Sequence, residues 1–160
     1  MTVGGLTPEE KARHLAYWDE TRADLSDITS PGTPDPDVFP LVDALNAMPG
    51  VCTVQSCAGH RSPEPKSFDT RDRGDGFTSG QLWLRVSDAV LVLLQARLAE
   101  LLAEPSIEQV SLLYGRTERS PVVDIVFHGN ERGMLPEASR AILSYFQSLL
   151  PTPEGAPTSR

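Results

Sequence analysis

The sequence predicts an α+β fold in a single domain, with a four-stranded, largely antiparallel sheet whose helices lie mainly on one face. Residues 80–87 alternate strictly between apolar and polar side chains, which is typical of a half-buried strand. Residues 107–114 and 121–127 read as two strands around a turn-forming segment, which predicts a hairpin, and Val123, Ile125 and Phe127 share one face of the second. Apolar residues at helical spacing before and after these strands predict helices that cover one face of the sheet.

The first helix has a clear start. Thr7 suits the N-cap, Pro8 the first helical position, and Glu10 completes a capping box. We therefore expect residues 1–25 to form an N-terminal helix. Residues 26–36 contain three prolines and a glycine and predict a linker.

The remaining sequence predicts a core domain at 37–150 and a disordered tail at 151–160, which is rich in Pro and Thr. Within the core we expect an apolar helix over 89–103 and a last helix from Pro136. Residues 61–79 are polar and lack periodicity, so they predict a long loop.

The net charge of the chain bears on which partners it can bind. Its 160 residues carry 14 Lys and Arg against 22 Asp and Glu, a net charge of −8, which disfavours general nucleic-acid binding but leaves structured RNA open. Arg61 and two further arginines follow the central turn and predict local recognition of an anion. The apolar runs are too short to span a membrane, and two cysteines make no disulfide framework, so we expect a cytoplasmic protein.

The chain is organised around the stretch from Pro49 to His60. A short β-prone run follows Pro49-Gly50, and the small residues Ser56 to Gly59 then leave almost no side-chain bulk. A tight turn of small residues lets a ligand approach backbone amides closely. The sequence therefore predicts a binding site where this strand ends.

Strand alternation also predicts a polar sheet face opposite Leu82, Leu84 and Val86. The residues expected on that face are Thr53, Gln55, Cys57, Trp83, Arg85, Asp124 and His128. A tryptophan beside an arginine could stack a planar ring of a ligand. Alternatively, Trp83 packs beneath the N-terminal helix or the 61–79 loop.

Cys57 and His60 have three interpretations. They could form half of a metal site, with Cys52 or His128 as a further ligand, although Cys52 and Cys57 face opposite ways on a regular strand. They could be a nucleophile and base, oriented by Asp124. Or Cys57 is a small buried residue and His60 a hydrogen-bonding turn residue.

A family resemblance rests on Asn46, Pro49-Gly50-Val51, Thr53, Gln55-Ser56-Cys57-Ala58-Gly59-His60 and the following Trp-containing strand. Across residues 41–86 the chain resembles the wybutosine-synthesis tRNA methyltransferase family, which carries Ser-Ser-Cys-Ser-Gly-Arg at a strand end. Gln55, Ala58 and His60 depart from that signature. The resemblance implies an α/β fold, S-adenosylmethionine as cofactor and methylation of a tricyclic guanosine derivative in tRNA. It matches Ser56, Cys57 and Gly59 to the family's site and Trp83 to its tryptophan strand.

We therefore expect a small-molecule- or nucleotide-binding protein with its site at the turn from Ser56 to His60. The ligand is small and planar or anionic, and the resemblance implies S-adenosylmethionine-dependent methyl transfer. The catalytic candidates are Cys57 and His60, and the cofactor-binding candidates are Ser56, Ala58, Gly59, Arg61, Trp83 and Arg85. One alternative is a non-catalytic interaction module that uses Trp18 or Trp83, and another is a thiol–histidine or metal-assisted enzyme.

Overall fold

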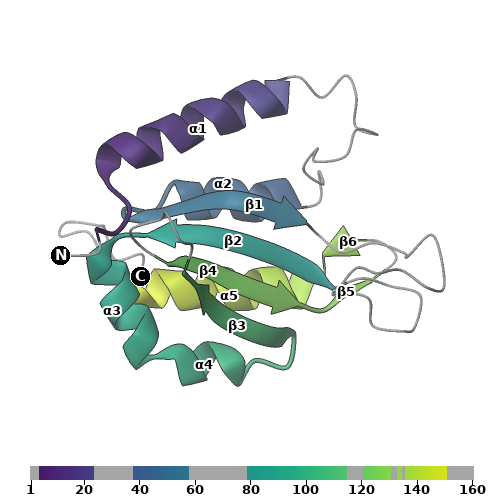
Figure 1. Ribbon diagram of the computed structural model, residues 1–160. Coiled ribbons are helices and arrows are strands. Elements are labelled where there is room, and N and C mark those ends of the chain that lie inside the picture. The colour runs from purple at the N-terminus through teal and green to yellow at the C-terminus, as the bar shows by residue number, and fades with distance from the viewer. Residues whose placement is uncertain are drawn as a thin grey trace, which may run out of the picture.

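The fold places one sheet at the centre of the molecule (Figure 1). The computed structural model describes residues 4–23, 38–57, 79–114, 121–130, 133–134 and 136–150. The central strands are β1 (Val51–Cys57), β2 (Gly80–Val86), β3 (Ile107–Leu113) and β4 (Val122–Phe127). They form an antiparallel sheet in the order β1-β2-β4-β3, which confirms the expected α+β class. The expected linker and tail lie outside the described residues.

Helices cover one face of this sheet and flank its β1 edge. They are α1 (Pro8–Ala23), α2 (Phe39–Asn46), α3 (Asp88–Ala96), α4 (Leu98–Leu102) and α5 (Pro136–Leu149), and a small ladder pairs β5 (Gly129–Asn130) with β6 (Gly133–Met134). Figure 1 shows α2 and α5 behind the sheet and α1 running alongside β1. The core forms between the sheet and these helices, because alternate strand residues point toward them. Its fully buried members include Leu82, Leu84, Ile125, Phe127, Leu45, Ile142 and Phe146.

The N-terminal helix begins as the sequence predicts. The Glu10 backbone N–H donates to Thr7 Oγ1 at 3.1 Å. Farther along α1, the Trp18 ring meets Phe39 of α2 edge-on, with centroids 5.2 Å apart, and its indole N–H donates to Asp43. Trp18 therefore joins α1 to α2.

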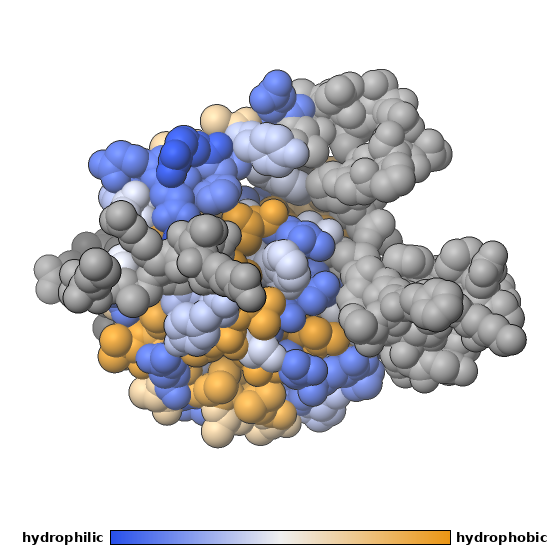
Figure 2. All heavy atoms as spheres, viewed as in Figure 1, coloured by the Kyte–Doolittle hydropathy of each residue, from blue (hydrophilic) through white to orange (hydrophobic). Residues whose placement is uncertain are grey.

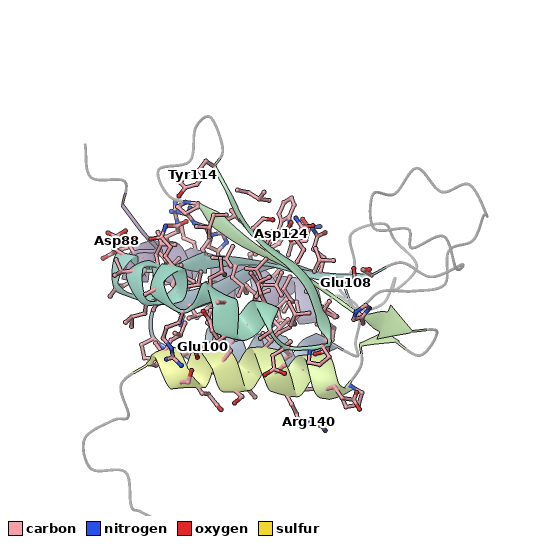
Figure 3. The ribbon with its side chains drawn as sticks, turned by 90° about the horizontal axis from the view of Figure 1, so that it is seen from below. Asp88, Glu100, Glu108, Tyr114, Asp124 and Arg140 are labelled. Atoms are coloured by element: carbon pink, nitrogen blue, oxygen red, sulfur yellow. The ribbon has the colours of Figure 1, made fainter. Side chains whose placement is uncertain are left out.

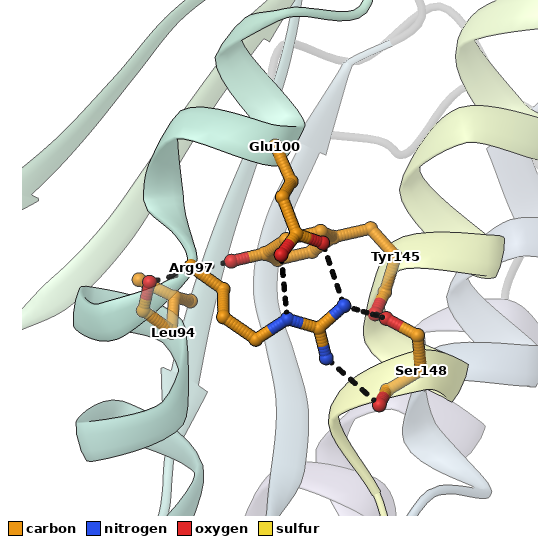
Figure 4. A network of polar contacts seen from close by, with 5 residues as sticks. All are labelled: Leu94, Arg97, Glu100, Tyr145 and Ser148. Carbon is orange, nitrogen blue, oxygen red and sulfur yellow. Dashed lines mark hydrogen bonds and ion pairs between the residues drawn. The ribbon is translucent and has the colours of Figure 1, made fainter.

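The helix expected over 89–103 is interrupted, which corrects that prediction. Arg97 leaves helical geometry with φ −119° and separates α3 from α4. Its guanidinium donates to both carboxylate oxygens of Glu100, at 2.9 and 2.6 Å, and to the Ser148 carbonyl at 3.0 Å (Figure 4). The hydrogen bonds from Arg97 lower the pKa of Glu100, and the bond to Ser148 connects the break to the end of α5.

The first strand contains an irregular step that the sequence does not reveal. Thr53 pairs with Leu84 but Gln55 pairs with Trp83, so Val54 is an extra residue. This step corrects the prediction for Thr53, which falls in the helix-facing row instead of the polar one. The expectation that Cys52 and Cys57 face opposite ways assumed a regular strand. The extra residue places both on one face of the sheet instead, because their β2 partners, Arg85 and Gln81, share that face.

A buried asparagine supports the irregular step. Asn46, at the end of α2, is 7% exposed, and its Oδ1 accepts the Thr53 backbone N–H at 2.7 Å. β1 is an edge strand of the sheet, so this side chain supplies a partner that no neighbouring strand provides. Asn46 therefore fixes the position of α2 relative to β1.

We predict that Gly50→Ala lowers the free energy of unfolding by about 2–3 kcal/mol, because a side chain there meets both strain and a helix cap. Gly50 has a φ of +71°, and an added Cβ would lie 2.5 Å from Ser87 Oγ, the N-cap of α3. Chemical denaturation measures the change. Gly4→Ala is the matched control, since a Cβ there meets nothing within 4 Å. Equal stabilities of the two variants would contradict this account.

Candidate functional site

One end of the sheet gathers the termini of all four central strands. Cys57 at the end of β1 pairs with Gln81 near the start of β2, and Gly80 pairs with Phe127 at the end of β4. Ile107 at the start of β3 also pairs with Phe127. The turn expected to form the site therefore leaves β1 at the end of the sheet where β2 and β3 begin and β4 stops.

The structure describes only part of the predicted turn. Ser56 pairs with Leu82 in the helix-facing row, and the Cys57 backbone closes β1. Ala58, Gly59, His60 and Arg61 lie outside the described residues, so their roles stay predictions. Apart from the end of β1, the described part of the site therefore comes from β2, β3 and β4.

The polar face of the sheet, defined by Gln55, Gln81, Trp83, Arg85 and Asp124, carries the predicted tryptophan. Leu82 and Leu84 point to the helices, and the register places Trp83 opposite Asp124 and Gln55 on the other face. Figure 2 views the sheet from the side opposite α2 and α5, where polar and apolar side chains are mixed. The expected face for Trp83, Arg85 and Asp124 is confirmed.

Trp83 brings a buried hydrogen-bond donor to this face. Its Nε1 is buried and has no hydrogen-bond partner among the described residues. Beside it, Gln81 Nε2 donates to Asp124 Oδ1 at 2.9 Å, and Asp124 is 8% exposed. Buried donors are normally paired in folded proteins. The indole N–H of Trp83 is therefore a buried donor whose hydrogen bond the described residues do not supply.

Arg85 is engaged by the N-terminal helix. Its Nε donates to Glu10 Oε1 at 2.9 Å and its Nη2 to Glu10 Oε2 at 3.1 Å, a bidentate ion pair. The residue is 8% exposed. Arg85 thus holds α1 against the polar face, and its charge is already balanced by a carboxylate.

Cys52 lies away from the end of the sheet described above. Its partner Arg85 lies four positions along β2 from Gln81, the partner of Cys57, a span of about 13 Å. Cys52 is fully buried, and burial raises the pKa of its thiol, whereas neighbouring Lys11 lowers it less strongly. Burial also lowers the pKa of Lys11, whose Nζ donates to the Met48 carbonyl. These contacts make Cys52 a buried structural residue.

Three side chains at the end of the sheet form a polar cluster that sequence reasoning missed in part. Ser79 Oγ lies 2.8 and 2.7 Å from the two carboxylate oxygens of Glu108, and His128 Nδ1 lies 2.9 Å from Glu108 Oε1. Figure 3 shows Glu108 beside β5 and β6, far from Asp88 at the start of α3. His128 was expected near the site, but Ser79 and Glu108 were not.

Glu108 reaches this cluster because β3 is irregular. Ile107 pairs with Phe127 and Gln109 with Val126, so Glu108 is an extra residue between them. Such bulges re-aim side chains and occur often beside active sites. The sequence pattern around Glu108 does not reveal the bulge. Ser79 was missed because it ends the segment 61–79, which predicts a loop.

An apolar cavity of about 530 Å³ lies at the opposite end of the sheet. Its walls include Leu6, Lys11, Gly50, Val90, Leu93 and Leu149. Val92 and Leu93 of the neighbouring α3 are 64% and 41% exposed. Figure 2 shows apolar side chains of this region at the surface. The molecule therefore has a polar and an apolar candidate site, at opposite ends of the sheet.

The described residues hold neither a metal-binding cluster nor a membrane-spanning helix. Among them, no three His, Cys, Asp or Glu side chains are grouped as a metal ion would require. In the same part of the chain, no helix has the length and apolar character needed to cross a membrane.

Comparison with known proteins gives a distant relative. No protein-family model matches the sequence. The chain is 30% identical over 122 residues to tRNA wybutosine-synthesizing protein 3 of Schizosaccharomyces pombe, an alignment that spans 76% of this chain but 45% of that protein. The chain thus spans less than half of the relative's length. This similarity supports, in general terms, the resemblance to the wybutosine-synthesis family that the strand-end motif indicated.

One solved structure is also similar. The PH1069 protein from Pyrococcus horikoshii aligns with 88% of this chain and 84% of its own, at a TM-score of 0.49 and 12% identity. A likeness this distant has no bearing on function.

We predict that Cys57→Ser leaves a folded protein whose remaining thiol, Cys52, does not react with Ellman's reagent until denaturant is added. The thiolate is the reactive form, and burial both raises the pKa of Cys52 and blocks access to it. The substitution itself should cost at most about 1–2 kcal/mol of unfolding free energy. Rapid labelling of the native variant would contradict the placement of Cys52.

Proposed function

We propose that this chain acts in RNA modification as an S-adenosylmethionine-dependent methyltransferase-like protein, with its ligand bound at the end of the sheet where β1 stops. The observation that carries the proposal is the similarity to tRNA wybutosine-synthesizing protein 3 over 76% of the chain. The turn motif from Ser56 to Gly59 adds support, because it resembles the family signature at the same strand end.

Features of the polar face fit a planar, polar ligand. The indole N–H of Trp83 is buried and unpaired among the described residues, and Asp124 beside it accepts from Gln81. An adenine ring can stack on an aromatic side chain and offers nitrogen acceptors to a buried donor. We assign Trp83 and Gln81 to the ligand, together with the backbone of the turn after Cys57. Arg85 is left out because Glu10 already balances its charge.

The cofactor would supply a methyl group from a sulfonium that becomes a neutral thioether. Such a transfer depends mainly on holding the acceptor in line, so no nucleophilic residue is required of the protein. This agrees with a buried Cys52 and assigns no bond-forming role to Cys57. The net charge of −8 favours recognition of the acceptor through local contacts over a long basic surface.

The first test is calorimetric titration of the full chain with S-adenosylmethionine and S-adenosylhomocysteine. We predict saturable binding by the parent and a three- to tenfold weaker affinity for Trp83→Phe, about the contribution of one hydrogen bond. Because Trp83 Nε1 has no partner among the described residues, Trp83→Phe removes no hydrogen bond between them, and any fall in melting temperature should reflect only the packing lost with the smaller ring.

Trp18→Phe is the matched control. It also removes one indole N–H, but that group donates to Asp43 between α1 and α2. This variant should lower the melting temperature and leave the affinity unchanged. Absence of heat and of thermal stabilisation for the parent with both compounds would contradict the proposed function.

A non-catalytic interaction module is the second candidate, favoured by the apolar cavity and by exposed Val92 and Leu93. Contiguous exposed apolar surface is common at protein contacts. With its contact surface at α3 rather than at Trp18 or Trp83, such a module would depend on α3 and would be indifferent to Trp83→Phe. The two candidates therefore place the functional surface at opposite ends of the sheet.

A further inference from the structure

The cluster of Ser79, Glu108 and His128 fixes the hydrogen position on the imidazole. A carboxylate only accepts hydrogen bonds, so the 2.9 Å contact with Glu108 requires the hydrogen on His128 Nδ1. The neutral ring then carries its lone pair on Nε2. That nitrogen has no partner among the described residues, and the His128 side chain is 39% exposed. The ring therefore presents a base to solvent at the end of the sheet.

The carboxylate behind this ring is held firmly. Ser79, which is 1% exposed, donates to Glu108, and the bulge in β3 turns Glu108 toward it. The His128 backbone N–H donates to the Ser106 carbonyl at 2.9 Å, which fixes the other end of the pair. A partly exposed hydrogen bond of this kind contributes about 1 kcal/mol to stability, so its main effect is to hold the ring in one orientation.

The cluster also lies close to the proposed ligand. Only β2 separates β4 from β1, and neighbouring strands lie about 4.8 Å apart, so β4 runs about 10 Å from the strand that ends at Cys57. His128 directly follows β4 at this end. A nucleoside bound over the polar face at the end of the sheet would come within reach of its ring.

We propose that His128 is the general base for the acceptor, with Glu108 and Ser79 as positioning residues; this inference rests on the proposed methyl-transfer function. As the acceptor nitrogen or oxygen gains a methyl group, its N–H or O–H bond breaks and the proton bonds to His128 Nε2. The resulting imidazolium is stabilised by the Glu108 carboxylate. The proton then leaves to water from the exposed side of the ring.

The test measures transfer of tritiated methyl groups from S-adenosylmethionine to unfractionated tRNA from fission yeast lacking its wybutosine-synthesizing protein 3. For His128→Gln we expect kcat to fall at least about 100-fold, the usual contribution of a general base, with the affinity for S-adenosylhomocysteine unchanged within about twofold. Added imidazole should restore part of the rate of His128→Ala. Glu108→Gln should lower kcat less and provides a second variant if His128 variants fail to fold.

His14→Gln is the matched control, because His14 is 33% exposed and lies 3.7 Å from Glu10, yet belongs to α1. It should keep the parental rate. A measurement independent of activity is ¹⁵N NMR of the His128 ring, which should show the hydrogen of the neutral form on Nδ1.

Different failures identify different errors. If the parent transfers methyl groups and His128→Gln keeps its kcat within threefold, the general base is wrong and the proposed function stands. The inference is also overturned if rate and ligand affinity fall together without imidazole rescue, or if the hydrogen lies on Nε2. A parent that transfers no methyl group overturns the proposed function, and the inference with it.

Discussion

The hydrogen bond between Asn46 and Thr53 is the constraint on which the candidate site depends. It connects the end of α2 to the edge strand at the residue before the irregular step. One extra residue in a strand reverses the face of every side chain beyond it. Without Val54 as that extra residue, Gln55 would turn toward the helices, and the end of β1 would meet β2 in a different register. The asparagine at the helix end thus has a structural role in the motif.

A second irregular step, in β3, acts on the other side of the sheet. It removes Glu108 from the alternation and directs its carboxylate to Ser79 and His128. The two bulges flank a regular β2–β4 pair that carries Trp83 and Asp124. A rigid central pair with irregular outer strands gives fixed polar groups at one end of the sheet. The apolar cavity at the other end is formed by helix ends and shares none of these groups.

The sequence predicted the architecture because local signals agreed with the fold. The Thr7 cap, the Pro49-Gly50 break and the alternation in β2 all appear where expected, although the Glu10 carboxylate that would complete a capping box pairs with Arg85 instead. The errors come from long-range effects. The break at Arg97 depends on a partner in α5, 51 residues away, and the bulges at Val54 and Glu108 depend on pairing with other strands. Ser79 and Glu108 therefore could not be recognised as site residues from the sequence.

The central claim is that the ligand binds at the polar end of the sheet and not in the apolar cavity. The most direct measurement is a ¹⁵N–¹H NMR titration of the full chain with S-adenosylhomocysteine. The account predicts that the largest shifts fall on the amides of Cys57, Gln81 and His128 and on the indole N–H of Trp83. Shifts confined to Leu6, Gly50 and Leu93, around the cavity, would contradict it.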